Sequence, residues 1–304
     1  MSRVAAIDCG TNSIRLLIAD ITNGNFKEVL RTMEIVRLGQ GVDQNKAFHP
    51  DAIDRTLAAV EKFVGLIKSK GVEKVRFCAT SATRDASNRE LFTGGVKKIL
   101  GVDVEVIPGE EEARLSFIGA TKELSQNDGP FLVVDIGGGS TEFVFGNESV
   151  DSAKSVNIGC VRMSERHLID QPPSMAQISQ AIIDIDIAIA QAAAIVPISE
   201  AKTLVAVAGT ATTVAAAALK LEQYDRYLIH LSRIPARSVY QVAGMFQSMD
   251  KDQIASLGYM HPGRVDVITS GALILSRIMA ATGASEFVAS ESDILDGIAW
   301  SLSN

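Results

Sequence analysis

The chain has 304 residues, which exceeds one average domain and fits two. Hydrophobic residues make up 47% of the sequence and charged residues 21%, so the composition supports a sizeable core and excludes a disordered protein. The net charge of −7 argues against a general nucleic-acid binder, which needs a broad basic surface. It leaves open a polyanion bound by a local cluster of arginines, backbone amides and a divalent metal.

The cysteines and the longest uncharged stretch exclude two further classes of protein. Cys9, Cys78 and Cys160 are odd in number and widely spaced, which argues against a disulfide framework or a zinc site and favours buried thiols. The stretch 203–219 contains Gly209 and is shorter than the roughly 20 apolar residues of a membrane-spanning helix. No signal peptide precedes the first apolar run, so we expect a cytoplasmic protein without membrane association.

Strands and helices alternate along the chain, which predicts the α/β class. Short apolar runs predict strands, and apolar residues at helical spacing predict helices. In the first part the predicted strands are 4–7, 14–19, 75–79 and 104–107, the helices are 51–69 and one beginning at Glu110, and the polar segment 80–88 is a loop.

A polar break at 125–129 marks the predicted domain boundary, which gives domains 1–124 and 125–304. Ser174 begins a long helix as its N-cap, and Gln177 completes a capping box. The other predicted elements of the second part are strands 131–134, 143–145 and 203–208 and helices 266–281 and 292–302. The last helix, about 292–304, is a candidate to pack back on the first domain.

One pattern occurs twice, as VAAIDCGTNS at 4–13 and LVVDIGGGST at 132–141. Each copy has an apolar strand, an Asp at its end, a glycine turn with hydroxyl side chains, and then a second apolar strand. Asp8 and Asp135 are 127 residues apart. This duplication predicts two similar lobes that face each other across a cleft.

The two turns have the composition of phosphate-binding loops. Glycine allows a positive φ and lets a ligand approach the backbone, successive amides form an anion nest, and hydroxyls add donors. An ordinary β-hairpin is the alternative for either turn alone, but two copies that each follow an Asp favour phosphate. The Walker and G-x-G-x-x-G patterns are absent, so the predicted cradle is of another kind. Its candidate phosphate-binding residues are Gly10, Thr11, Asn12, Ser13, Gly137, Gly138, Gly139, Ser140 and Thr141.

Carboxylates beside the turns could bind a metal. Asp8, Asp135 and Glu142 are candidate ligands for Mg²⁺ (or Mn²⁺), which takes few protein carboxylates and keeps waters and phosphate oxygens as its other ligands. For Glu142 taken alone, a solvated turn residue is the alternative.

Three other segments carry candidate residues. Arg84 could bind phosphate in a bidentate way or form a surface salt bridge with Asp85. The acids at 110–112 suit the first turn of a helix, and spacing alone does not choose which of them faces the cleft. The turn 208–213 could cradle a phosphate or a nucleoside, or could reflect close packing of a helix on a strand. Further candidate substrate contacts are Arg15, Gly209 and Thr210.

These segments together resemble the exopolyphosphatase / guanosine pentaphosphate phosphohydrolase family, in its short two-domain type. That family belongs to the actin-like ATPase superfamily, whose fold has two ribonuclease-H-like lobes. DIGGGSTE at 135–142 together with GEEEAR at 109–114 is specific to the family, and the likeness covers nearly the whole chain. The other matching segments are IDCGTNSIRLLI at 7–18, ATSATRDASN at 79–88, NIGCVRMSE at 157–165, AGTATT at 208–213 and RVDVITSGALIL at 264–275.

The resemblance implies roles for single residues. The family's catalytic Glu precedes the Ala of its E-E-A motif, which selects Glu112. Its metal-binding Asp corresponds to Asp135 and the Glu that closes the motif to Glu142. Its phosphate-binding Arg corresponds to Arg84. The resemblance also implies a homodimer.

The chain departs from the family pattern in two places. Relatives often have Gly where this chain has Ala208, which we expect to be a mild change. Relatives also often have S-D-R-G-L-R-E-G near the C-terminus, whereas SESDILDG at 290–297 lacks both basic residues. We therefore expect this chain to bind a long polyanion differently from relatives that have both basic residues. We expect the chain to lack the extra helical domains of the longer members.

The sequence thus predicts an exopolyphosphatase that releases orthophosphate from the end of inorganic polyphosphate by Mg²⁺-assisted in-line attack of water. Guanosine pentaphosphate is a further candidate substrate. One alternative is an ATPase or small-molecule kinase of the same superfamily, because the turns suit ATP as well. The other is a non-catalytic sensor of guanosine alarmones or polyphosphate, against which the predicted water-positioning acid argues.

Overall fold

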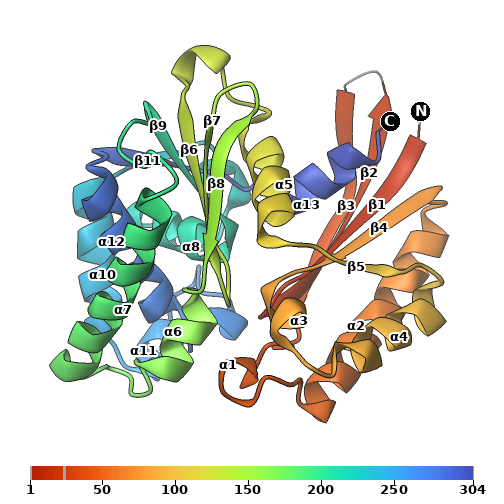
Figure 1. Cartoon of the computed structure of the whole chain (residues 1–304), viewed down its shortest axis with the longest axis horizontal. Helices are drawn as coiled ribbons and strands as arrows, with labels where there is room; N and C mark the ends of the chain where they lie inside the picture. Colours follow the sequence, from red (N-terminus) through yellow and green to blue (C-terminus); the bar gives the residue numbers. More distant parts are fainter. Residues whose placement is uncertain (1, 23–24, 304) are drawn as a thin grey trace. The chain divides into compact units, whose positions relative to one another are not determined.

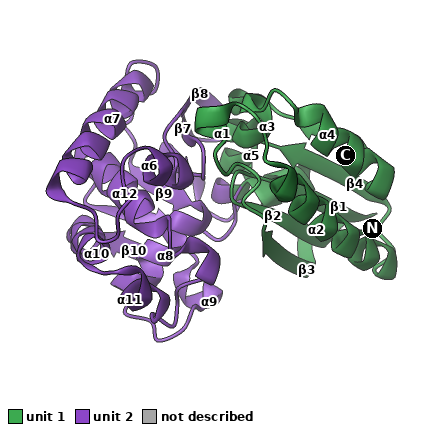
Figure 2. Cartoon of the chain, turned by 90° about the horizontal axis from the view of Figure 1, so that it is seen from below, with its two compact units in different colours: residues 1–119, 294–304 green, residues 120–293 purple. Residues whose placement is uncertain are grey.

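The computed structural model describes residues 2–22 and 25–303. It divides into two compact units, of which unit 1 comprises Met1–Gly119 and Ile294–Asn304, and unit 2 comprises Ala120–Asp293 (Figure 2). Each unit has one sheet and its own hydrophobic core, so the predicted α/β class with two lobes is confirmed. The first boundary falls between residues 119 and 120, earlier than the predicted 124 and 125, and the C-terminal segment belongs to unit 1.

The sheet of unit 1 has five strands in the order β3-β2-β1-β4-β5 (Figure 1). The first three strands form antiparallel pairs, and β4 and β5 continue the sheet in parallel with β1. The strands are β1 (Ser2–Cys9), β2 (Ser13–Thr22), β3 (Asn25–Ile35), β4 (Lys74–Ala79) and β5 (Val104–Val106).

The middle of strand β1, residues 4–7, is apolar throughout because both of its faces are covered. Ala5 and Ile7 point into one cluster with residues of α2 (Pro50–Ser69) and α4 (Arg89–Leu100). Val4 and Ala6 point into another cluster with residues of α5 (Gly109–Thr121) and α13 (Ile294–Ser301). In Figure 1 the blue α13 accordingly lies beside the red strands of the N-terminus.

Helices α5 and α13 approach each other very closely. A Cβ added at Gly297 of α13 would lie 2.0 Å from the backbone oxygen of Leu115 in α5. Only glycine therefore allows this crossing without a shift of one helix. Unit 1 also contains α1 (Val42–Asn45) and α3 (Ser81–Asp85). The short α3 corrects the prediction that 80–88 is a loop, because one helical turn is too short to show apolar periodicity.

The sheet of unit 2 has the order β10-β11-β9-β6-β7-β8. From β8 to β6 the pairs are antiparallel, β9 and β11 then run parallel to β6, and β10 is an added antiparallel edge strand. Apart from β10, this order repeats that of unit 1, which agrees with the duplicated sequence pattern. The strands are β6 (Phe131–Ile136), β7 (Thr141–Gly146), β8 (Val150–Val156), β9 (Thr203–Val207), β10 (Arg233–Pro235) and β11 (Glu286–Ala289).

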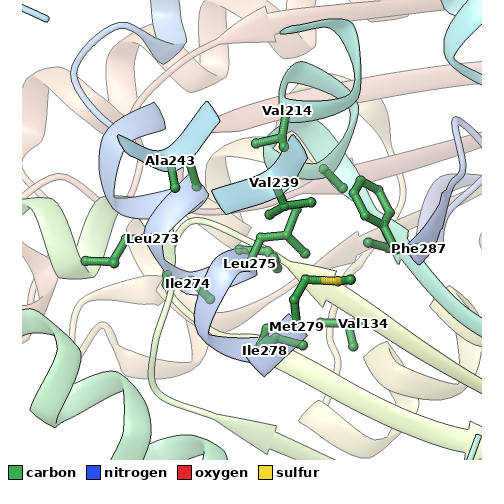
Figure 3. Close-up of a cluster of buried hydrophobic side chains, with 14 of the residues drawn as sticks. Val134, Val214, Val239, Ala243, Leu273, Ile274, Leu275, Ile278, Met279 and Phe287 are labelled. Atoms are coloured by element: carbon green, nitrogen blue, oxygen red, sulfur yellow. The ribbon is translucent and has the colours of Figure 1, made fainter. Parts of the chain in front are cut away.

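Helix α12 (Ile268–Thr282) forms the centre of the unit 2 core. Its Leu275 and Met279 pack with Val239 of α10 (Ala236–Ser248) and Phe287 of β11, as Figure 3 shows. The remaining helices are α6 (Cys160–Arg166), α7 (Met175–Ala193), α8 (Ala208–Ala218), α9 (Arg226–Ile229) and α11 (Lys251–Ala255). Across the described residues, no helix has both the length and the apolar character needed to cross a membrane.

The predicted capping box begins α7. The Ser174 hydroxyl accepts from the Gln177 amide at 3.3 Å, and the Gln177 side chain accepts from the Ser174 amide at 2.9 Å. This reciprocal pair satisfies two donors that the first helical turn leaves unbonded. The helices predicted at 266–281 and 292–302 begin two residues later, at Ile268 and Ile294.

Candidate active site

The two predicted turns have the same backbone hydrogen bond. The amide of Gly10 donates to the carbonyl of Ser13 at 3.0 Å, and the amide of Gly137 donates to the carbonyl of Ser140 at 3.0 Å. Neither glycine has the positive φ that we expected. A Cβ at Gly137 would instead lie 3.1 Å from the Ser140 oxygen, so lack of space favours glycine there.

In the first turn the carbonyl groups are held by the segment 36–39. The amide of Gly39 donates to Thr11 O at 2.8 Å, and the amides of Val36 and Arg37 donate to Asn12 O at 3.1 and 2.9 Å. A Cβ at Gly39 would lie 2.3 Å from the Cγ2 atom of Thr11, so this support depends on glycine. The sequence reasoning missed this segment, whose local signal is only a glycine pair at 39 and 41.

In the second turn the carbonyl groups are held by the start of α6. The amides of residues 160–162 donate to the carbonyls of Gly137 and Gly138 at 2.9–3.0 Å. The buried Arg162 adds a bond from its Nε to Gly139 O at 2.6 Å. No backbone acceptor within the described ranges binds the amides of Gly138 and Gly139. With the carbonyls bonded on one side, these amides remain available to an anion.

Gly159 makes this contact between α6 and the second turn possible. A Cβ at this position would lie 2.4 Å from the carbonyl oxygen of Gly138 and 2.7 Å from the amide nitrogen of Gly139. Gly159 itself has extended backbone, with φ −158° and ψ 163°. The requirement for glycine is therefore one of space, which the sequence alone does not reveal.

The hydroxyl groups of the second turn are bonded inside the protein. Ser140 Oγ donates to Glu142 Oε1 at 2.8 Å, and Thr141 Oγ1 donates to Ile158 O at 2.7 Å. Ser155 Oγ of β8 donates to the same oxygen of Glu142 at 2.7 Å. In this structure Ser140 and Thr141 thus stabilise the turn, and phosphate binding by the turn would rest on its backbone amides.

Asp135 and Glu142 lie directly opposite each other on β6 and β7. Both are buried, with 6% and 1% of their surface exposed. Like charges directly opposite each other in a sheet destabilise it, so two buried carboxylates in register suit a bound cation. No cluster of three or more His, Cys, Asp or Glu side chains in the described residues could hold a metal. The pair fits Mg²⁺, which needs few protein ligands.

In unit 1 the residue equivalent to Asp135 is paired with an arginine. Asp8 lies opposite Arg15 in the β1–β2 register, and Asp8 Oδ2 accepts from Arg15 Nε at 3.0 Å and from Arg15 Nη2 at 2.7 Å. The position opposite this Asp is therefore an arginine in unit 1 and Glu142 in unit 2. Metal binding by Asp8 would have to compete with Arg15, and it stays a prediction.

Glu112 forms an ion pair with Arg84. Arg84 Nη1 donates to Glu112 Oε2 at 2.7 Å and to Ile107 O at 2.9 Å, so the backbone helps to orient the arginine. Glu112 is buried, with 7% of its surface exposed. A buried carboxylate with a specific charged partner is a candidate functional residue.

The neighbouring acids have other surroundings. Glu111 accepts from both Arg114 and Arg76, and the hydrogen bonds from Arg114 lower the pKa of this carboxyl. Glu110 is exposed. The structure therefore separates three acids that spacing could not separate, and it gives Glu112 alone the contact with Arg84.

The turn at the start of α8 is covered by Arg264. A Cβ at Gly209 would lie 2.5–2.6 Å from the guanidinium of Arg264, whose Nη1 also donates to Thr213 Oγ1 at 2.9 Å. Thr210 packs against Gly271, where a Cβ would lie 2.6 Å from the Thr210 hydroxyl. Close packing thus accounts for the small residues here. Arg264 lies in a matched segment but was not singled out as a site residue.

The sequence and the fold are similar to those of known proteins. The chain is 45% identical to Exopolyphosphatase 2 of Mycobacterium tuberculosis, over 99% of both chains. It is 36% identical to a guanosine-5'-triphosphate,3'-diphosphate pyrophosphatase of Pseudoalteromonas atlantica over 54% of this chain and 32% of that protein. A crystal structure of an exopolyphosphatase-like protein superposes with a TM-score of 0.95 at 42% identity, covering 99% of this chain and 98% of the other. Residues 17–302 match the model of the Ppx/GppA phosphatase family, and the chain belongs to that family.

Proposed function

We propose that this protein is an exopolyphosphatase that releases orthophosphate from the end of inorganic polyphosphate. The observation that carries the proposal is the buried Glu112 that Arg84 holds at 2.7 Å, in the same unit as the glycine turn at 10–13. The near full-length similarity to Exopolyphosphatase 2 supports the same reaction. A buried acid of this kind argues for turnover and against a protein that only binds a polyanion.

Glu112 acts on the attacking water in this proposal. Its carboxylate accepts a hydrogen bond from the water and takes up its proton as the water attacks the terminal phosphorus in line with the leaving phosphate. Arg84 keeps Glu112 oriented, and its remaining guanidinium donors can bind phosphoryl oxygen. The backbone amides of Gly138 and Gly139, which no backbone acceptor in the described residues binds, can donate to phosphoryl oxygen.

Asp135 and Glu142 would hold Mg²⁺ or Mn²⁺. When bound, the cation neutralises charge on the phosphoryl oxygens. The support is that these two buried carboxylates lie directly opposite each other on neighbouring strands, so that both can contribute oxygen ligands to one cation.

The substitution Glu112→Gln tests the role of Glu112, with phosphate release from polyphosphate as the readout. Gln keeps an oxygen that accepts from Arg84, so the fold is retained while the base is lost. We expect a rate decrease of about 10²–10⁴-fold, the usual contribution of a positioned base. The exposed Glu110 of the same helical turn provides a matched control, and Glu110→Gln should keep near wild-type activity. A Glu112→Gln enzyme at the wild-type rate would refute the assigned role.

Guanosine pentaphosphate is a second candidate substrate, favoured by the partial match to a guanosine-5'-triphosphate,3'-diphosphate pyrophosphatase. Parallel assays with short polyphosphate, long polyphosphate, guanosine pentaphosphate and ATP distinguish the candidates. Release from ATP alone would instead support an ATPase of the same superfamily. Tight binding without release would support a sensor. We also propose a homodimer and a cytoplasmic location, which light scattering and cell fractionation would test.

A further inference from the structure

Ser155 contacts a residue of the proposed metal site from a strand that the sequence reasoning did not connect with it. It lies on β8 directly opposite Glu142 on β7. Its hydroxyl donates to Glu142 Oε1 at 2.7 Å, and the Ser140 hydroxyl donates to the same oxygen at 2.8 Å. Glu142 has 1% of its surface exposed, so its carboxylate is shielded from bulk water. Hydrogen bonds to an ionised acceptor are roughly twice as strong as those between neutral groups.

These two bonds restrict how the carboxylate can turn. Ser140 approaches Oε1 from the glycine turn, and Ser155 approaches it from the neighbouring strand. With Oε1 held on both sides, the direction of the second oxygen is fixed as well. A glutamate side chain has three rotatable bonds and loses conformational freedom when it binds a metal, so an orientation fixed in advance favours binding.

We propose that Ser155 is a positioning residue that holds the Glu142 carboxylate in the orientation that binds the divalent cation. This inference rests on the proposed function, because that proposal makes Glu142 a metal ligand. Ser155 is not assigned any contact with the substrate. Its effect should therefore appear in metal binding, and the Michaelis constant for polyphosphate at saturating metal should change little.

The experiment measures Mn²⁺ binding to the substrate-free protein by electron paramagnetic resonance. For Ser155→Ala we expect the dissociation constant to rise about 10-fold or more, in the range usual for groups that orient a ligand. Ser155→Thr keeps the hydroxyl on a β-branched side chain that suits a strand, so it should restore most of the affinity. Ser152→Ala is the matched control, because the Ser152 hydroxyl lies on the same strand, is buried and has no hydrogen-bond partner.

The outcomes separate this inference from the proposed function. If Ser155→Ala binds Mn²⁺ like the wild type, or if Ser155→Thr is as impaired as Ser155→Ala, the positioning role is wrong. If Glu142→Ala and Asp135→Ala both bind Mn²⁺ like the wild type, the metal site of the proposed function is wrong. In the Glu142→Ala background, Ser155→Ala should cause no further loss, and a further loss of the same size would also overturn the inference.

Discussion

Replacement of Gly159 by alanine is a direct test of how the second glycine turn is held. The new Cβ would lie 2.4 Å from Gly138 O, whereas ordinary contacts begin near 3.4 Å, so one side must move by about 1 Å. The backbone at Gly159 is extended and accepts alanine. The effect of Gly159→Ala should therefore come entirely from a displacement of α6 or of the turn that α6 supports.

The size of the effect follows from that displacement. Overpacking at a tightly packed position costs about 1–3 kcal/mol of unfolding free energy. A misplacement of about 1 Å in a group that positions the reacting atoms can lower the rate by about 10²-fold. We therefore expect Gly159→Ala to remain folded, to unfold at a lower urea concentration, and to release phosphate about 10²-fold more slowly.

The measurements are a urea titration and an assay of phosphate release from polyphosphate, on the same preparations. Gly244 in α10 is the matched control in the same unit, because nothing lies within 4 Å of a Cβ built there. Gly244→Ala should raise the unfolding free energy by up to about 1 kcal/mol without loss of activity. A Gly159→Ala protein with wild-type stability and wild-type activity would refute the argument that this close contact positions the turn.

Three further results are expected. Ala208 has φ 66°, a backbone conformation that favours glycine. Ala208→Gly should therefore raise the unfolding free energy by about 0.5–1 kcal/mol, measured as a shift of the urea midpoint, and a lower midpoint would contradict the strain argument. Gly297→Ala should lower the unfolding free energy by about 1–3 kcal/mol and so lower the urea midpoint, because the new Cβ would meet the Leu115 carbonyl of α5 at 2.0 Å. An unchanged midpoint would show that the helices separate easily. Burial raises the pKa of the Cys78 thiol to about 12 and of the Cys160 thiol to about 11, so iodoacetamide at pH 8 should modify neither in the native protein and both after denaturation, as measured by intact mass. Because these folded-state pKa values exceed the ordinary value of 9.0, the unfolding free energy should also fall as the pH rises from about 9 to about 11.

Much of the fold could be predicted because its signals are local. The hairpins that follow Asp8 and Asp135, the capping box at Ser174 and the apolar strands all depend on residues close together in sequence. The duplicated pattern then indicated two lobes, and the repeated strand order agrees with it. The boundary was five residues late because the polar segment 125–129 looked like a linker, whereas the chain changes unit within α5.

The supports of the site could not be predicted because they depend on close contacts between distant segments. Gly39 and Gly159 are needed for space that only the folded chain defines, and a lone Ser155 in a polar strand looks like any exposed serine. The hydroxyls of Ser140 and Thr141 were expected to meet phosphate. In the structure they bond to protein oxygens, because buried hydroxyls need partners, and their contact with phosphate stays a prediction.

The way α13 completes unit 1 has a consequence for synthesis on the ribosome. All five strands of that sheet have emerged by Val106, but the helix that covers one of its faces begins at Ile294. At about 5–20 residues per second, synthesis from Val106 to Ile294 takes roughly 10–40 s, and α13 cannot pack on that apolar face during this time. Residues 120–293 contain a whole sheet and core, so the second unit can fold during translation before the first is complete. The nascent N-terminal half is thus the stage at which this chain most needs a chaperone.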